Sequence, residues 1–277
     1  MANPEVSVIV PTKNSAATLE ACLESIRSQT FKSLELIVID NFSSDETREI
    51  AARLADRVFT RGPERSAQRN FGAKMSSGDY LLMIDSDMEL DQNVIQACVD
   101  SSRSNPSVVG LAIPEESFGI GFWAQCKRLE RSFYIGVTWL EAARFFCREA
   151  YDAVGGYEEE LISGEDWDLS RRLGRLGPIS RIDYYIYHNE GHVSLTSAIR
   201  KKYYYAKFAK AYLSRNPERS KIGAQVGPLR RYALFFSKPG KLFGRPVVGL
   251  AMLFMKGCEF TSGAIGYMLS RQNKWSF

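Results

Sequence analysis

Within the first 113 residues, short apolar runs alternate with segments that have helical spacing. The runs at 6–10, 34–39, 80–84 and 108–113 are continuous, with a shorter strand candidate at 57–60. Strands buried on both faces carry such runs, whereas a strand with one solvent face alternates apolar and polar residues. The segments at 17–29, 44–54, 66–75 and 92–101 repeat apolar residues at helical spacing. We therefore predict an α/β fold whose mostly parallel sheet is flanked by helices on both faces.

The remainder of the chain is less regular. It offers a strand candidate at 143–147, a helix that begins near Glu165, a strand at 179–187 and a long basic helix at 195–215. We predict one α/β domain at 1–194, divided near residue 113, and a helical extension at 195–277 that is both basic and apolar.

Cysteine usage and the N-terminus bear on the compartment. The five cysteines are far apart and form no Cys-x-x-Cys pair. They are expected to be free thiols in a reducing compartment rather than a disulfide framework or a zinc site. Residues 1–6 show no basic segment followed by an apolar core, so we expect no signal peptide and a cytoplasmic location.

Polar residues stand where three of the predicted strands end. They are Pro11, Thr12 and Asn14, then Asp40 and Asn41, then Asp85, Ser86 and Asp87. In open α/β sheets, ligands bind beyond the carboxyl ends of the strands. Two carboxylates one residue apart at a buried strand end favour a cation, and oxygen ligands suit Mg²⁺ or Mn²⁺. A turn capped by an aspartate is the simpler alternative for Asp85-Ser86-Asp87 taken alone.

Several short motifs in this order resemble the inverting family 2 glycosyltransferases. They are VSVIVPTKN at 6–14, ELIVIDNFSSD at 35–45, RNFG at 69–72 before GDY at 78–80, DSD at 85–87, and GGY at 155–157 leading to GEDWDL at 164–169. The resemblance covers roughly residues 5–190. It implies a GT-A fold, which is Rossmann-like, with a nucleotide-sugar-binding half at 1–113 and an acceptor half at 114–194.

The resemblance also implies roles for individual residues. Donor binding falls to Pro11, Thr12, Asn14, Asp40, Asn41, Arg69, Asn70, Asp85 and Ser86. Asp87 and Asp85 would address the metal, Asp166 would be the catalytic base, and Glu165 would support it or contact the acceptor. GT-A enzymes often have a metal-binding histidine late in the domain, which favours His188 as a further ligand. An ordinary polar loop histidine is the alternative for His188, and the same holds for His192.

The implied reaction is a metal-dependent glycosyl transfer by single displacement, with inversion. The donor would be a nucleotide-diphosphate sugar, with a UDP-sugar first and a GDP- or dTDP-sugar next, and the acceptor a glycan or a polyprenyl-linked molecule. A nucleotidyltransferase is the enzymatic alternative, but residues 11–16 lack the Gly-rich phosphate loop expected there. The other alternative is a non-catalytic, membrane-associated protein that binds a nucleotide or glycan on the same scaffold.

Charge is distributed unevenly along the chain. The net charge is +4, yet residues 200–245 contain thirteen Lys or Arg and a single acid, Glu218, interleaved with aromatic residues. Such a mixture suits an anionic membrane surface or a nucleic acid, and a plain solvated helix is the simpler alternative. The apolar run at 247–255 favours the membrane, so we predict a peripheral location at the inner face of the cell membrane and no nucleic-acid partner. Lys256 and Glu259 interrupt the apolar segment, which leaves it too short for a spanning helix.

Overall fold

The computed structural model describes residues 3–215 and 227–270. Its main sheet has the strand order β3-β2-β1-β4-β8-β6-β9. Strands β3, β2, β1 and β4 are mutually parallel, and β8 is antiparallel to both of its neighbours. The strands are β1 (Val6–Thr12), β2 (Leu34–Asp40), β3 (Arg57–Thr60), β4 (Tyr80–Met83), β6 (Gly110–Ala112), β8 (Ala143–Cys147) and β9 (Ile179–Arg181).

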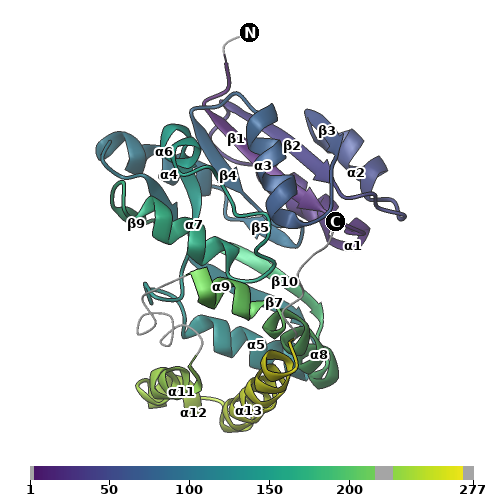
Figure 1. Cartoon of the computed structure of the whole chain (residues 1–277), viewed down its shortest axis with the longest axis vertical. Coiled ribbons are helices and arrows are strands. Elements are labelled where there is room, and N and C mark those ends of the chain that lie inside the picture. Colours follow the sequence, from purple (N-terminus) through teal and green to yellow (C-terminus); the bar gives the residue numbers. More distant parts are fainter. Residues whose placement is uncertain (1–2, 216–226, 271–277) are drawn as a thin grey trace. The chain divides into compact units, whose positions relative to one another are not determined.

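Helices cover both faces of this sheet, as predicted (Figure 1). They are α1 (Ala16–Arg27), α2 (Thr47–Leu54), α3 (Arg65–Met75), α4 (Val94–Ser104), α6 (Arg148–Ala153) and α7 (Glu165–Leu173). Successive residues of β1 point to opposite cores: Val8 and Val10 pack with residues of α1, α2 and α4, whereas Ile9 packs with residues of α3, α6 and α7. Burial on both faces explains why β1, β2 and β4 are apolar at most positions. Within β1 and β2, Ser7 and Glu35 are buried polar exceptions, and the Ser7 hydroxyl donates to Glu35 at 2.7 Å.

A second, three-stranded sheet has the order β5-β10-β7. Its strands are β5 (Met88–Leu90), β10 (Ile186–His192) and β7 (Glu115–Ile120). The single strand predicted at 179–187 is therefore two strands, β9 and β10, which belong to different sheets. The antiparallel pairing of β10 with β5 places His188 opposite Met88. Met88 directly follows Asp87, so His188 lies close to that aspartate.

The chain divides into two compact units. Unit 1 contains residues 1–116, 141–160 and 165–189, and unit 2 contains residues 117–140, 161–164 and 190–277. Unit 2 includes α5 (Phe122–Ser132) from the middle of the chain as well as the residues from 190 onward, and the domain boundary at residue 194 stays a prediction. Strands β7 and β10 each continue from one unit into the other.

Unit 2 is mainly helical. Its other helices are α8 (Leu195–Ala206), α9 (Ala209–Arg215), α11 (Pro228–Phe236), α12 (Pro239–Phe243) and α13 (Pro246–Met268). The single helix predicted at 195–215 is two helices, and Ser194 begins the first with a reciprocal capping box to Ser197. A core of Cys126, Phe133, Phe235, Leu242, Met252 and Met255 joins α5, α11, α12 and α13. Of the basic stretch at 200–245, residues 216–226 lie outside the described residues.

Candidate active site at the strand ends of unit 1

The ends of β1 and β2 are tied together by Asp40. This carboxylate is fully buried and accepts a hydrogen bond from the Thr12 hydroxyl at 3.0 Å. It also accepts from the Ser43 backbone N–H at 2.9 Å and from the Ser43 hydroxyl at 2.5 Å. Three donors satisfy a charge that would otherwise be costly to bury.

The loops that follow these two strands have unusual backbone conformations. Asn14 and Phe42 have φ values of 49° and 51°, in the left-handed region that residues other than glycine seldom adopt. The Asn14 side-chain oxygen accepts from the Ser44 N–H at 2.9 Å, and the Asn41 amide donates to the Pro63 carbonyl at 2.6 Å. Such conformations cluster at ligand sites when the surrounding structure enforces them. Contact of these loops with a nucleoside stays a prediction, as it does for Pro11 within β1.

Asp85, directly beyond β4, faces two buried arginines. Arg69 Nη2 lies 2.6 Å from Asp85 Oδ1, and Arg144 Nη1 lies 3.5 Å from Asp85 Oδ2. Burial alone would raise the pKa of Asp85, but the two guanidinium groups outweigh it and hold that pKa far below its ordinary value. Asp85 is therefore ionised, with both oxygens directed at arginines.

Arg69 links Asp85 to the acids of α7. Its side chain is fully buried, and Nη1 lies 3.0 Å from Asp166 Oδ1 and 3.6 Å from Glu165 Oε1. The Tyr157 ring lies against its guanidinium, with 5.0 Å from Cζ to the ring centroid. One guanidinium thus joins the first aspartate of the Asp85-Ser86-Asp87 motif to the predicted base.

Glu165 and Asp166 differ in environment although they are adjacent. The Glu165 side chain is buried, whereas that of Asp166 is 29 % exposed. Burial and the neighbouring Asp166 charge raise the pKa of Glu165 to about 7, against the opposing effects of Arg65 and Arg69. Asp166 is consequently the more accessible carboxylate of the two, and Glu165 holds a proton up to near neutral pH.

Asp87 and His188 form a separate pair. Asp87 Oδ2 lies 3.0 Å from His188 Nε2, and the Asp87 side chain is 39 % exposed. Within residues 3–215 and 227–270, no three His, Cys, Asp or Glu side chains group as a metal site. Because both Asp85 oxygens face arginines, we revise the expected metal set from three protein residues to Asp87 and His188. Ser86 lies between the two aspartates and donates to the Ser15 hydroxyl at 2.8 Å.

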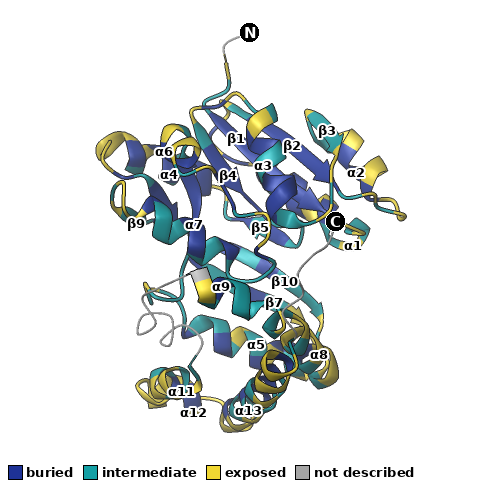
Figure 2. Cartoon of the chain, viewed as in Figure 1, coloured by how far each residue is buried: buried dark blue, intermediate teal, exposed yellow. Residues whose placement is uncertain are grey.

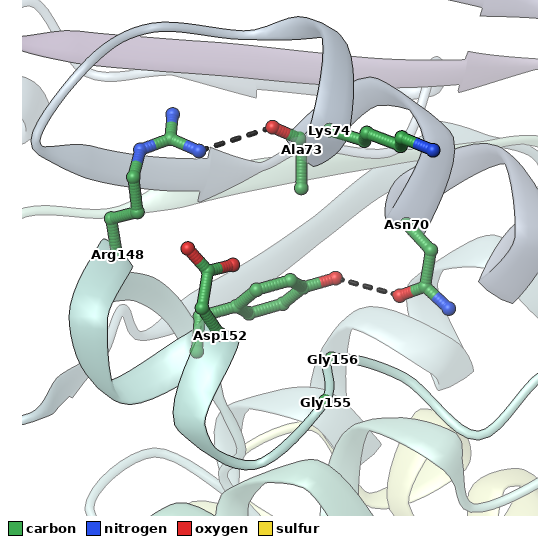
Figure 3. Close-up of a pocket in the computed structure, with 8 residues that line it drawn as sticks. Asn70, Ala73, Lys74, Arg148, Asp152, Gly155 and Gly156 are labelled. Carbon is green, nitrogen blue, oxygen red and sulfur yellow. Dashed lines mark hydrogen bonds between the residues drawn. The ribbon is translucent and has the colours of Figure 1, made fainter.

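Asn70 follows Arg69 on α3, but its amide is engaged elsewhere. Its oxygen accepts from the Tyr151 hydroxyl and the Tyr157 N–H, both at 2.8 Å. Its nitrogen donates to the Tyr157 carbonyl at 2.8 Å. Asn70 also lines a cleft of about 470 Å³, together with residues of α3, α6 and the Gly155-Gly156 turn. Figure 3 shows these lining residues. These contacts fix the turn that precedes α7, and a contact of Asn70 with the donor stays a prediction.

Two further residues of this cluster were not predicted from the sequence. Arg144 lies on β8, and its Nε donates to Glu115 Oε1 at 2.6 Å. The sequence around Glu115 indicates no site, and the partners of both residues lie on elements that are distant in the chain. The arginine that follows the first residue of a short apolar strand (ARFFC) was the only available signal.

The arrangement has the parts that a group transfer requires. A partly exposed carboxylate, Asp166, can accept a proton, and an oxygen–nitrogen pair, Asp87 and His188, is suited to a divalent cation. Arg69 and Asp85 form a buried ion cluster that connects Asp166 with the strand end that contains Asp87.

Comparison with known proteins identifies the family of the chain. The family model for glycosyl transferase family 2 matches residues 7–157. The chain is 30% identical over 153 residues to a *Campylobacter jejuni* protein named GalNAc(5)-diNAcBac-PP-undecaprenol beta-1,3-glucosyltransferase, with 51% of this chain and 49% of that protein covered. It is 38% identical over 184 residues to a *Mycobacterium bovis* PGL/p-HBAD biosynthesis glycosyltransferase, with 62% and 70% covered. The match spans only about half the length of the first relative, and 30% of *Escherichia coli* chondroitin synthase.

Solved structures share the fold over almost the whole chain. The mannosyltransferase PcManGT from *Pyrobaculum calidifontis*, solved with GDP-Man and Mn²⁺, has a TM-score of 0.69 at 16% identity, with 98% of this chain and 89% of that chain covered. *S. aureus* TarS 1–349 with UDP-GlcNAc has a TM-score of 0.53 at 18% identity, with 99% and 93% covered. The predicted GT-A fold is confirmed, and the chain belongs to glycosyl transferase family 2.

Proposed function

We propose that this chain transfers a sugar from a nucleotide-diphosphate sugar to an acceptor hydroxyl, with inversion at the anomeric carbon. The observation that carries the proposal is the Arg69 bridge between Asp85 and Asp166. The bridge holds Asp85, which lies beside the predicted donor site at the end of β4, in a fixed position relative to Asp166. Asp166 is the carboxylate that can serve as a base.

Asp166 is the proposed catalytic base. It would accept the proton of the acceptor hydroxyl as that oxygen attacks the anomeric carbon from the face opposite the nucleotide. A single displacement of this kind inverts the anomeric centre, because bond formation and bond cleavage occur on opposite faces. Glu165, kept protonated by its surroundings, would preserve a single negative charge at this position below neutral pH.

Asp87 and His188 are the proposed ligands of Mg²⁺ or Mn²⁺. Two protein ligands fit these ions, which commonly take their remaining positions from substrate phosphates and water. A bound ion would neutralise the negative charge that develops on the leaving diphosphate. The Mn²⁺ in the PcManGT structure supports this choice of cofactor.

The proposed donor is a nucleoside diphosphate sugar bound along the loops after β1 and β2. Structural relatives were solved with GDP-Man, UDP and UDP-GlcNAc. A UDP-sugar is the first candidate, followed by GDP- and dTDP-sugars. Thr12, Asp40 and the left-handed loop residue Asn14 would border the nucleoside.

The proposed acceptor is a glycan or a polyprenyl-linked molecule, handled at the inner face of the cell membrane. The name of the Campylobacter jejuni relative includes undecaprenol, and a succinoglycan biosynthesis protein of Rhizobium meliloti is 27% identical over 192 residues. Both names support an envelope or extracellular polysaccharide as the destination of the sugar.

The test is a product assay with a synthetic polyprenyl-diphosphate-linked disaccharide and a panel of UDP-, GDP- and dTDP-sugars. We expect release of one nucleoside diphosphate, an extended acceptor with inverted anomeric configuration by NMR, and a loss of about 10³-fold or more with Asp166→Asn. Inorganic diphosphate released from a nucleoside triphosphate would instead identify a nucleotidyltransferase. Full activity of Asp166→Asn would reject the assigned base.

A further inference from the structure

Helix α13 presents apolar residues to the outside and charged residues to the inside. Val247, Leu250, Phe254, Ile265 and Met268 are 71, 59, 59, 43 and 70 % exposed, and their spacing of three, four, eleven and three residues keeps them on one stripe. The opposite side of the helix, which includes Lys256 and Glu259, is buried. A helix on the surface of a water-soluble domain normally has the reverse pattern.

The buried charges are satisfied within unit 2. Lys256 Nζ lies 2.7 Å from Glu130 Oε1 and 2.6 Å from Glu259 Oε2. Lys127 Nζ lies 2.7 Å from Glu259 Oε1 and 3.1 Å from Glu130 Oε2. Two cations and two carboxylates therefore form a neutral cluster between α5 and α13, and removing one member of such a cluster leaves an unpaired buried charge.

Close backbone packing fixes the rotation of α13 about its axis. A Cβ at Gly249 would lie 2.1 Å from the Leu242 carbonyl oxygen, and one at Gly266 would lie 2.5 Å from the Tyr203 carbonyl oxygen. Together with the ion cluster, these contacts prevent the helix from turning its apolar stripe inward. The packing within unit 2 therefore keeps the apolar stripe of α13 exposed.

Helices α11 and α12, which precede α13 in the chain, also expose apolar residues. Leu229, Phe236 and Phe243 are 84, 51 and 41 % exposed, and the Tyr232 hydroxyl of α11 donates to the Leu253 carbonyl of α13 at 3.0 Å. Residues 228–255 contain five Lys or Arg and no acid. We define the C-terminal apolar surface as the exposed residues Leu229, Phe236, Phe243, Val247, Leu250, Phe254, Ile265 and Met268. Exposed residues run along α11 and α13 in Figure 2.

We infer that the C-terminal apolar surface binds the surface of a bilayer that carries anionic headgroups. Four of these five cations, Arg230, Lys238, Lys241 and Arg245, are exposed, whereas Arg231 is half-buried against the Tyr134 ring. Exposed cations without an acid in the same stretch repel a second copy but attract anionic lipids, by about fivefold in affinity for each cation near the surface. Exposed phenylalanines and aliphatic residues can enter the headgroup and acyl boundary, as in interfacial helices.

The helix lies in the interface rather than across the bilayer. By length and composition alone α13 could cross a membrane. However, its polar side packs along α8, whose Arg200 and Lys201 are exposed, and a crossing would carry these charges into hydrocarbon. The inference depends on unit 2 alone and is independent of the proposed transfer reaction.

The test is sedimentation of the full chain with vesicles of phosphatidylcholine, with and without an equal part of phosphatidylglycerol, at low and high salt. The variants are Val247→Asn/Leu250→Asn/Phe254→Asn and Lys238→Gln/Arg245→Gln. Leu176→Asn, which replaces a 54 % exposed leucine of unit 1, is the matched control. Circular dichroism and nucleotide-dependent thermal shift without lipid verify that each variant is folded.

We expect the wild type to bind vesicles that contain phosphatidylglycerol, and this binding should weaken at high salt. The affinity for these vesicles should fall at least tenfold in the apolar triple variant, and about 25-fold at low salt in the double cation variant. The control should bind like the wild type. Absence of binding, equal binding to both vesicle types, or an equal loss in Leu176→Asn would overturn the inference. A solution dimer that the triple variant converts to a monomer would assign the surface to a second copy instead. A variant that keeps its nucleotide response but loses vesicle binding separates this inference from the proposed function.

Discussion

At the scale of single residues, charge balance explains the protonation of the site. Three arginines, Arg65, Arg69 and Arg144, face four acids: Asp85, Glu115, Glu165 and Asp166. A buried cluster with one acid in excess tends to retain a proton on its most buried, least compensated carboxyl. Glu165 is that group, since burial and Asp166 raise its pKa to about 7.

Arg69→Lys tests whether Arg69 positions Asp166 for the reaction or contributes to binding of the nucleotide. A lysine keeps the charge but has a single nitrogen, so it cannot reach both Asp85 and Asp166 as the two Nη atoms of arginine do. We expect the transfer rate to fall about 100-fold, as for a misplaced base. Because Arg69 is fully buried and both of its Nη atoms face acids, the dissociation constant for the nucleotide should change little, and a large change would instead support the predicted contact of Arg69 with the donor. Arg103→Lys, at an exposed pair with Glu5, is the control. A wild-type rate in Arg69→Lys would show that the bridge does not position Asp166.

Glu165→Gln should change how stability depends on pH. The pKa of Glu165 is raised from 4.5 to about 7 in the folded chain, so the folded state binds more protons than the unfolded state between these values. The wild type should therefore lose stability relative to Glu165→Gln as the pH rises from about 4.5 to about 7, with a constant difference above that range.

Urea unfolding of both proteins at pH 5, 6, 7 and 8 measures this difference. The exposed Glu149→Gln in α6 is the control. A difference between wild type and Glu165→Gln that is constant across the whole range would contradict the assigned environment of Glu165.

The sequence predicted the acids of this site better than their partners. Asp85, Asp87 and Asp166 stand in short motifs whose position at a strand end or a helix start is visible in the chain. The partners of Asp85 come from α3 and β8, which lie 16 and 59 residues away in the sequence. Only the fold brings Arg144 to Asp85, so no local pattern could have predicted that pair.

At the scale of elements, long and uniformly buried segments were predictable and short ones were not. Strands β1, β2 and β4 have continuous apolar runs because both of their faces are covered. Strand β5 has three residues and β7 is partly exposed, so neither has a period long enough to recognise. Lys256 and Glu259 interrupt the apolar segment in the sequence, yet α13 runs through both because Glu130 and Lys127 of α5 compensate their charges.

Gly249→Ala tests the packing of α12 against α13. The added Cβ would meet the Leu242 carbonyl oxygen at 2.1 Å, which requires a backbone shift and should destabilise the protein by about 1–3 kcal/mol. Gly257→Ala, in the same helix, meets only the Tyr232 hydroxyl at 3.4 Å. This control should be neutral or stabilising by up to about 1 kcal/mol, since alanine favours a helix more than glycine. Equal denaturation midpoints for the two variants would mean that the close contact has no energetic role.

At the scale of the whole molecule, the two units have different chemistry. Unit 1 contains the acids of the strand ends and the arginines that hold them, whereas the acid-free, apolar stretch at 228–255 belongs to unit 2. The charge asymmetry visible in the sequence corresponds to this division. The sequence could not show which segments form unit 2. Helix α5 comes from the middle of the chain and belongs to this unit because it shares a core with α11, α12 and α13.

The central claim is a metal-dependent nucleotide-sugar site at the end of β4. Its most direct test is thermal unfolding with UDP, GDP and dTDP, each with and without Mn²⁺, for the wild type, Asp87→Asn and the exposed control Asp183→Asn. A nucleotide at about 100 times its dissociation constant stabilises a protein by about 2.7 kcal/mol. The account predicts that one nucleotide raises the melting temperature only with Mn²⁺, that Asp87→Asn abolishes this shift, and that Asp183→Asn retains it. No shift with any nucleotide, or a shift that is independent of Mn²⁺ and unchanged in Asp87→Asn, would contradict it.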